Sequence, residues 1–155
     1  MVGALYAALT AALAPLSYGL VQFRFAEALC LLPFYAPGTV WGLFVGCLLA
    51  NLLSPAGLPD IIVGSLATLL AVLTVRKIKR RWLAPLPVVV FNALMVGAVL
   101  SFYAMDIFGE PVAYAAAALS VGFGQLVVCY GLGLPLLYIL PRVPYFRQLT
   151  MNNEQ

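Results

Sequence analysis

The stretch DIIVGSLATLLAVLTVRKIKRR, residues 60–81, decides the fold of this chain. Residues 60–75 are an apolar run that opens on Asp60, a suitable N-cap for a helix. Five of the eight basic residues of the chain then follow within residues 76–81. An apolar helix that ends in a basic cluster is typical of a transmembrane segment and its cytoplasmic loop. A nucleic-acid-binding patch is the less favoured interpretation, because the cluster lies in a short turn between two apolar runs.

The composition of the whole chain also indicates a membrane protein. Of the 155 residues, 65% are apolar and 8% are charged, whereas a soluble domain is about half apolar and about a quarter charged. The mean hydropathy is +1.06. Polar side chains are too few to cover a water-facing surface, so the sequence predicts a single all-α integral membrane domain over residues 1–155.

Proline, glycine and the few charged residues divide the chain into six apolar runs, each expected to be a transmembrane helix. The first begins almost at the N-terminus without a basic region before it, so we expect a retained helix and not a signal peptide. The last contains several glycines and Pro135, which favour close packing, a static bend or a deformable wall beside a site. The expected helices cover residues 2–16, 26–36, 39–54, 60–75, 84–105 and 112–140.

The basic residues predict how these helices are oriented in the plasma membrane. If the 76–81 cluster is cytoplasmic, both termini are cytoplasmic as well, and seven of the eight basic residues lie inside. The inside set then includes Arg142 and Arg147 in the C-terminal tail. The exception, Arg24, is placed outside together with Asp60, Asp106 and Glu110.

Several absences in the sequence argue against an enzyme. There is no histidine, and the three cysteines lie in apolar runs without a CxxC pair, where buried small apolar side chains are expected (Cys30, Cys47 and Cys129). No GxxxxGK[ST] loop is present to bind nucleotide phosphates. The sequence therefore predicts a protein without catalytic residues, metal or cofactor, which cannot hydrolyse ATP by itself.

Polar side chains within or beside the apolar runs are the candidate binding residues. Amides offer both donors and acceptors, which suit a neutral heterocycle with mixed edges. Two alternatives stay open: amides that only join helices, and an Arg24–Glu27 ion pair spaced i,i+3 at the water boundary. The candidates are Gln22, Arg24, Glu27, Asn51, Asn92 and Gln125.

The first apolar run carries small residues at four-residue spacing. Such a row forms a flat stripe on a helix, which another helix can approach closely. The stripe serves either packing within the bundle or the docking of a partner subunit. It consists of Ala4, Ala8 and Ala12, with Gly3, Ala7 and Ala11 beside it.

Three groups of residues resemble the QueT family: APLSYGLVQFRFAEALCLLP, GLFVGCLLANLLSPAGLPDIIVGSLATLLA and LAPLPVVVFNALMVG. The resemblance covers residues 4–140. It implies the six-helix fold of a substrate-binding S component of an energy-coupling factor (ECF) transporter, with both termini cytoplasmic. It also implies a transmembrane T component and two cytosolic ATPases as partners, and docking of the T component on the stripe of Ala4, Ala8 and Ala12. The implied cargo is a queuosine precursor, a 7-deazaguanine. Another vitamin-like cargo, or a structural membrane protein without a ligand, is the alternative.

For such a cargo, the sequence suggests a role for Glu27 on the first turn of the second helix. A carboxylate accepts hydrogen bonds from the ring N–H and the amino group of a guanine-like edge at once. Gln22 or Arg24 would donate to the neighbouring carbonyl. The amides on the other helices, Asn51, Asn92 or Gln125, would close the far side.

Overall fold

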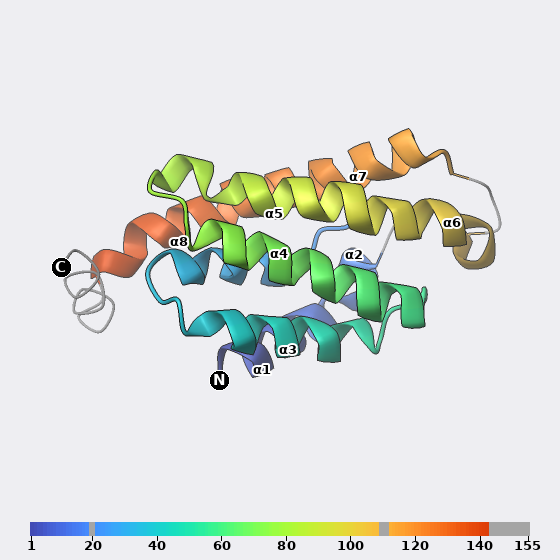
Figure 1. The fold of residues 1–155 in the computed structure, drawn as a ribbon. Coiled ribbons are helices and arrows are strands. Elements are labelled where there is room, and N and C mark those ends of the chain that lie inside the picture. Colours follow the sequence, from blue (N-terminus) through green and yellow to red (C-terminus); the bar gives the residue numbers. More distant parts are fainter. Residues whose placement is uncertain (19–20, 109–111, 143–155) are drawn as a thin grey trace.

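The described part of the protein is helical throughout. In a computed structural model, the described residues are 1–18, 21–108 and 112–142, with the backbone alone for residues 105–108, and no strand occurs among them (Figure 1). The side chains of Asp106, Glu110 and Arg147, which the sequence assigned to the two sides of the membrane, lie outside this description.

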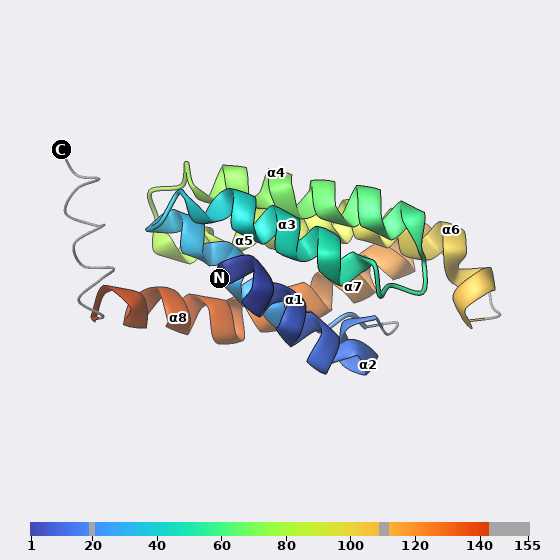
Figure 2. The same ribbon diagram turned by 90° about the horizontal axis from the view of Figure 1, so that it is seen from below.

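Six helical rods make up the described fold, and they run back and forth along one long axis (Figure 1, Figure 2). The first three are short: α1 (Val2–Ala12) continued by α2 (Ala14–Ser17), the 3₁₀ helix η1 (Phe25–Phe34), and α3 (Thr39–Asn51). The fourth joins η2 (Asp60–Gly64) to α4 (Ser65–Val75).

The last two rods are the longest. The fifth joins η3 (Arg81–Leu83), α5 (Pro85–Phe91), η4 (Asn92–Val96) and α6 (Gly97–Phe108). The sixth joins α7 (Tyr114–Val128), η5 (Cys129–Gly133), α8 (Leu134–Ile139) and η6 (Leu140–Arg142). Segments of 24 residues (Arg81–Ala104) and 29 residues (Tyr114–Arg142) within them are long and apolar enough to cross a membrane. The other four rods are apolar but shorter, so the six-span arrangement stays a prediction.

Glycine contacts set how closely α1 lies against α3. The backbone of Gly3 touches the backbones of Gly42 and Gly46, so a Cβ on Gly3 or Gly46 would collide with the other helix. This contact uses the Gly3 side of α1. Ala4, Ala8 and Ala12 are exposed on a different side of that helix.

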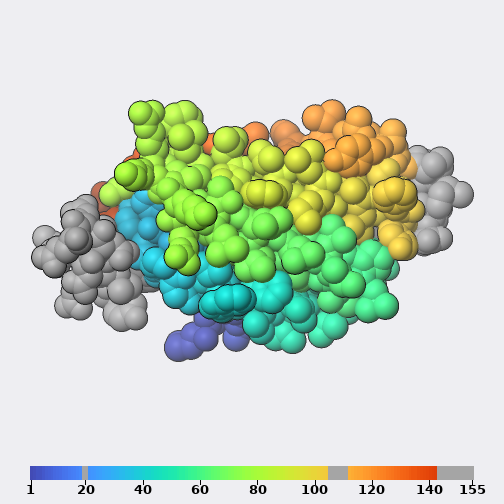
Figure 3. Space-filling model, in the orientation of Figure 1, coloured from blue at the N-terminus to red at the C-terminus, as the bar shows by residue number. Residues whose placement is uncertain are grey.

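The outer surface of the bundle is rich in large apolar side chains. Trp41, Phe102, Leu119 and Phe123 are each more than half exposed, and α3, α4, α5 and α6 form one continuous face in the space-filling view (Figure 3). The interior holds a large apolar core around Leu31, Leu43 and other residues of the first rods. A surface of this kind suits contact with lipid chains, which require no polar groups from the protein.

Candidate ligand-binding site

All six candidate binding side chains predicted from the sequence are buried. The most exposed of them, Gln22, has 5% of its surface accessible, and Glu27 and Asn51 have none. Arg24, Glu27 and Asp60 are the charged side chains buried among the described residues. Because buried charges are expensive without partners, the contacts of these residues define the site.

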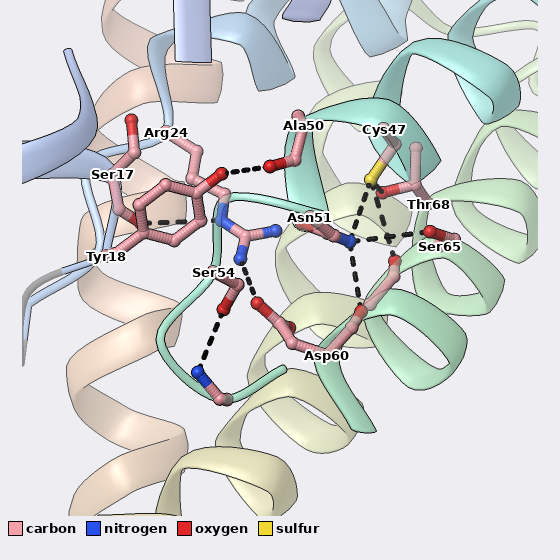
Figure 4. Close-up of polar contacts among 12 residues, drawn as sticks. Ser17, Tyr18, Arg24, Cys47, Ala50, Asn51, Ser54, Asp60, Ser65 and Thr68 are labelled. Atoms are coloured by element: carbon pink, nitrogen blue, oxygen red, sulfur yellow. Dashed lines mark hydrogen bonds and ion pairs between the residues drawn. The ribbon is translucent and has the colours of Figure 1, made fainter. Parts of the chain in front are cut away.

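Arg24 forms an ion pair with Asp60 and not with Glu27, so the alternative of an Arg24–Glu27 pair is wrong. The Arg24 Nη2 atom lies 2.9 Å from Asp60 Oδ2 (Figure 4). Its Nε also donates to the carbonyl oxygen of Ser17 over 3.4 Å, and its guanidinium lies 5.4 Å from the centre of the Tyr18 ring. Arg24 has a non-helical backbone just before η1, so the helical i,i+3 spacing to Glu27 does not apply. Asp60 is the first residue of η2, whose N-cap is Pro59, so the prediction of Asp60 as the N-cap is wrong.

Glu27 lies on the first turn of η1, where its carboxyl bonds the hydroxyls of Tyr6 and Thr68 and also interacts with the Cys30 thiol. The Tyr6 hydroxyl donates to Glu27 Oε1 over 2.7 Å, and the Thr68 hydroxyl donates to the same oxygen over 3.5 Å. The second oxygen, Glu27 Oε2, is buried and has no hydrogen-bond partner. One acceptor of this carboxylate is therefore unused by the protein.

Asn51 connects Glu27 to the ion pair. Its Nδ2 donates to the carbonyl oxygen of Asp60 over 3.0 Å, and lies 3.5 Å from Cys47 Sγ (Figure 4). The sulfur of Cys47 lies 3.2 Å from the Thr68 hydroxyl, which also bonds Glu27. One chain of polar contacts thus runs through the first four rods: Tyr6, Glu27, Thr68, Cys47, Asn51, Asp60 and Arg24. We call these seven residues the polar network.

Asn92 and Gln125 are buried, but no contact among those described joins them to the polar network. Neither amide atom of Asn92 has a hydrogen-bond partner. Gln125 Oε1 accepts a weak hydrogen bond from Cys129 Sγ over 3.8 Å. The backbone of Gln22 lies against Gly124, the neighbour of Gln125. The helical turns that hold Asp60 and Asn92, η2 and η4, pack together.

A wide helical turn accompanies three of the buried polar positions. The π-helical segments η2, η4 and η5 begin at Asp60, Asn92 and Cys129, and Cys129 bonds Gln125. Such π turns are rare and often occur at functional sites. Their position favours a site between the rods, and the sequence carries no periodic signal that predicts them.

The site offers more acceptors than donors to a ligand. Buried polar atoms in proteins are nearly always hydrogen-bonded, yet five side-chain oxygens and one amide nitrogen here are not. They are Gln22 Oε1, Glu27 Oε2, Asn51 Oδ1, Asp60 Oδ1 and both amide atoms of Asn92. This set suits a molecule that presents several N–H groups.

A small pocket adjoins the network at the end of the bundle that holds the turn of residues 52–59. It is lined by Tyr18, Gln22 and Asp60, by residues 54–56, and by apolar side chains of the fifth rod. Its volume is about 10 Å³, space for roughly one water molecule. This volume is too small for a bicyclic ring, so a ring of that size enters only if the residues that line the pocket move apart.

Four members of the polar network were not among the binding residues predicted from the sequence. Asp60 had a signal, since an acidic residue is rare beside a membrane helix and marks a functional candidate. Cys47 is buried and free, as are Cys30 and Cys129, which agrees with the prediction for the cysteines. Tyr6 and Thr68 carry no sequence signal, because tyrosine and threonine are common in apolar helices.

Comparison with known proteins places the chain in a family. The sequence profile described as QueT transporter matches residues 1–142. No curated protein and no solved structure matches the chain. Among the described residues, no cluster of three or more His, Cys, Asp or Glu side chains is placed to hold a metal ion. Since the profile covers nearly the whole sequence, the chain belongs to the QueT transporter family, a family of membrane transporters.

Proposed function

We propose that this protein is the substrate-capture subunit, or S component, of an ATP-driven ECF importer. In this proposal it lies in the plasma membrane with six spans, binds a queuosine precursor of the 7-deazaguanine class from outside, and passes it to a shared transport module. The observation that carries the proposal is the group of unpaired, buried acceptors in a chain of the QueT transporter family.

The chemistry of a 7-deazaguanine fits these acceptors. Its six-membered ring presents an N–H beside an amino group, and its five-membered ring presents a second N–H. The oxygens of Gln22, Glu27, Asn51 and Asn92 offer matching acceptors, and the Asn92 amide nitrogen offers a donor to the ring carbonyl. Gly124, the residue before Gln125, lies against the backbone of Gln22.

The energy for import must come from other subunits. The sequence has no loop that binds nucleotide phosphates, so a T component and two cytosolic ATPases complete the transporter. The exposed row of Ala4, Ala8 and Ala12 supports α1 as the docking face for the T component, since the other side of α1 already packs against α3.

Asn92 provides the sharpest test of the binding site. Its amide has no protein partner among the described residues, so Asn92→Leu removes two unpaired polar atoms and breaks no hydrogen bond. Such a change should leave the thermal stability equal or higher. Loss of the amide should nevertheless weaken 7-deazaguanine binding roughly tenfold or more, as measured by calorimetry on detergent-purified protein.

Thr74→Val is the matched control, because Thr74 is a polar helical residue remote from the network that bonds only to its own helix. It should bind as wild type does. Binding of 7-deazaguanine by Asn92→Leu at full affinity would remove Asn92 from the site.

If wild type binds a vitamin such as thiamine or riboflavin instead, the cargo is different. If it binds none of these ligands, a structural role is favoured.

A further inference from the structure

The turn of residues 76–81 carries positive charge that no described carboxylate offsets. It lies at the end of the bundle opposite the turn of residues 52–59 (Figure 1). Five of its six residues are basic. The acidic side chains that the structure describes, Glu27 and Asp60, are both buried in the polar network. Four cations of the turn are therefore exposed without an anionic partner among the described residues: Arg76, Lys77, Lys79 and Arg80.

Arg81, the fifth cation, holds this turn against the rest of the bundle. Its guanidinium carbon lies 5.6 Å from the centre of the Tyr35 ring and 5.7 Å from the centre of the Tyr138 ring. Tyr35 follows η1 and Tyr138 belongs to α8, so the start of the fifth rod is joined to the second and sixth rods. The Tyr35 hydroxyl is buried and has no hydrogen-bond partner among the described residues. This end of the bundle thus combines unneutralised cations with one unused hydroxyl.

An exposed apolar row leads from the turn along the outside of the fifth rod. Its four large side chains follow each other at four-residue spacing, which places them along one side of a helix. Each has between 43% and 54% of its surface exposed: Trp82, Leu86, Val90 and Leu94. We call these four residues the outer row. From its first to its last residue the row rises roughly 18 Å, which is about the thickness of one hydrocarbon leaflet of a bilayer.

We propose that the 76–81 turn and the outer row together bind an anionic phospholipid. The phosphate lies against the exposed cations of the turn, and the acyl chains lie along the outer row. Each Lys or Arg beside a membrane surface adds roughly fivefold to the affinity for anionic lipids. Trp82 suits the same level, since tryptophan is typical of the headgroup region. This binding site is separate from the polar network and does not depend on the cargo.

The outer row is the reason to choose a lipid as the occupant of this surface. An acidic protein or a nucleic acid would also be attracted by the cations of the turn. Neither of these needs an exposed apolar row that continues from the cations for the depth of a leaflet. A phospholipid has both parts, a charged headgroup and acyl chains, in the order in which the turn and the outer row offer their partners.

The first experiment measures the thermal unfolding of the detergent-purified chain with three additives. Dioleoyl phosphatidylglycerol is anionic, dioleoyl phosphatidylcholine is zwitterionic, and glycerol 3-phosphate has a phosphate without acyl chains. Phosphatidylglycerol should raise the unfolding temperature by about 3–6 °C at roughly ten times its dissociation constant. This shift should become smaller as salt is added, and the other two additives should have little effect.

Two results of this scan would overturn the proposal. Equal shifts from both lipids would show that the cations do not select the headgroup. A shift from glycerol 3-phosphate as large as that from phosphatidylglycerol would show a site for a free anion, in which the outer row has no part.

The second experiment assigns the lipid to the turn with two matched triple variants. Lys77→Gln, Lys79→Gln, Arg80→Gln removes three exposed charges, whereas Lys77→Arg, Lys79→Arg, Arg80→Lys keeps them. Arg81 stays in both variants, because it packs between two rings. Affinity follows from the dependence of the unfolding temperature on phosphatidylglycerol concentration. The neutral variant should lose roughly a hundredfold in affinity, and the charged variant should bind as wild type does.

A single variant keeps the test decisive if the neutral triple variant does not fold. Lys79→Gln alone should lose roughly fivefold in affinity for phosphatidylglycerol. Full affinity in the neutral variants would overturn the proposal. If those variants keep full affinity but no longer co-purify with the ATPase subunits, the turn is a docking surface for an acidic protein instead.

Discussion

At the scale of single residues, Arg24 and Glu27 have separate roles although only two residues lie between them. Arg24 joins the segment before η1 to the fourth rod through Asp60, whereas Glu27 joins η1 to the first and fourth rods through Tyr6 and Thr68. The first contact pairs a cation with an anion, and the second pairs a carboxyl with two hydroxyls. Each leaves one carboxyl oxygen without a hydrogen-bond partner, Asp60 Oδ1 and Glu27 Oε2. Arg24 therefore mainly holds two segments of the chain together. Glu27 is the better placed of the two to contact a ligand.

This division predicts a specific pattern of stabilities for Arg24 variants. Arg24→Gln leaves Asp60 as a buried, unpaired charge, which costs about 3–5 kcal/mol in typical proteins. The double variant Arg24→Gln, Asp60→Asn removes both charges and should recover a large part of that loss. Thermal unfolding of the detergent-purified variants measures both effects.

An ion pair between Arg24 and Glu27 would give the opposite pattern of stabilities. If those two residues formed the ion pair, Asp60→Asn would not rescue Arg24→Gln, and Glu27→Gln would. Rescue by Glu27→Gln greater than rescue by Asp60→Asn would therefore contradict the Arg24–Asp60 pair.

At the scale of helices, the sequence predicts where the apolar elements lie but not their internal geometry. The fourth rod covers Asp60–Val75, the range expected from the apolar run and the basic cluster after it. The second rod is a 3₁₀ helix and not an α-helix, and three rods contain π turns. Hydropathy reports burial along a segment, and these helix types depend on packing against other segments. The partner of Arg24 is 36 residues away, which no local pattern reveals.

The two sides of α1 lead to a prediction about partner docking. Ala8 is exposed, whereas Gly3 touches α3. Ala8→Trp should therefore leave the thermal stability and ligand binding close to wild type, but should block co-purification with the T component, because a bulky side chain prevents close helix approach. Co-expression with the T component and ATPases, followed by affinity purification, measures the complex.

Gly46→Ala is the matched contrast within the same helix pair. Its new methyl group meets the backbone of Gly3, so it should lower the stability of the isolated subunit by about 1–3 kcal/mol. A complex of normal yield from Ala8→Trp would show that the alanine row is not the docking face. A loss of stability in Ala8→Trp equal to that in Gly46→Ala would instead indicate packing inside the bundle.

At the scale of the whole molecule, polar groups are concentrated at two places. The polar network lies inside the bundle, and its small pocket opens beside the turn of residues 52–59. The basic cluster lies at the opposite end (Figure 1). The proposed function, solute binding on one side and contact with ATPases on the other, requires this separation. The pocket has space for roughly one water molecule, so the proposed capture of a base requires the residues that line the pocket to move apart.

This arrangement predicts that the turn of residues 52–59 faces outward and the 76–81 turn faces the cytoplasm. The physical reason is the preference of basic loops for the cytoplasmic side. Leu58 is 73% exposed and Lys79 is exposed, so each accepts a cysteine that reagents reach, whereas the three native cysteines are buried and free. In intact cells, a membrane-impermeant maleimide should label Leu58→Cys and leave Lys79→Cys unlabelled. After permeabilisation it should label both, and the wild-type chain should stay unlabelled throughout. Labelling of Lys79→Cys in intact cells would reverse the orientation and place the binding site on the cytoplasmic side, which is incompatible with capture from outside.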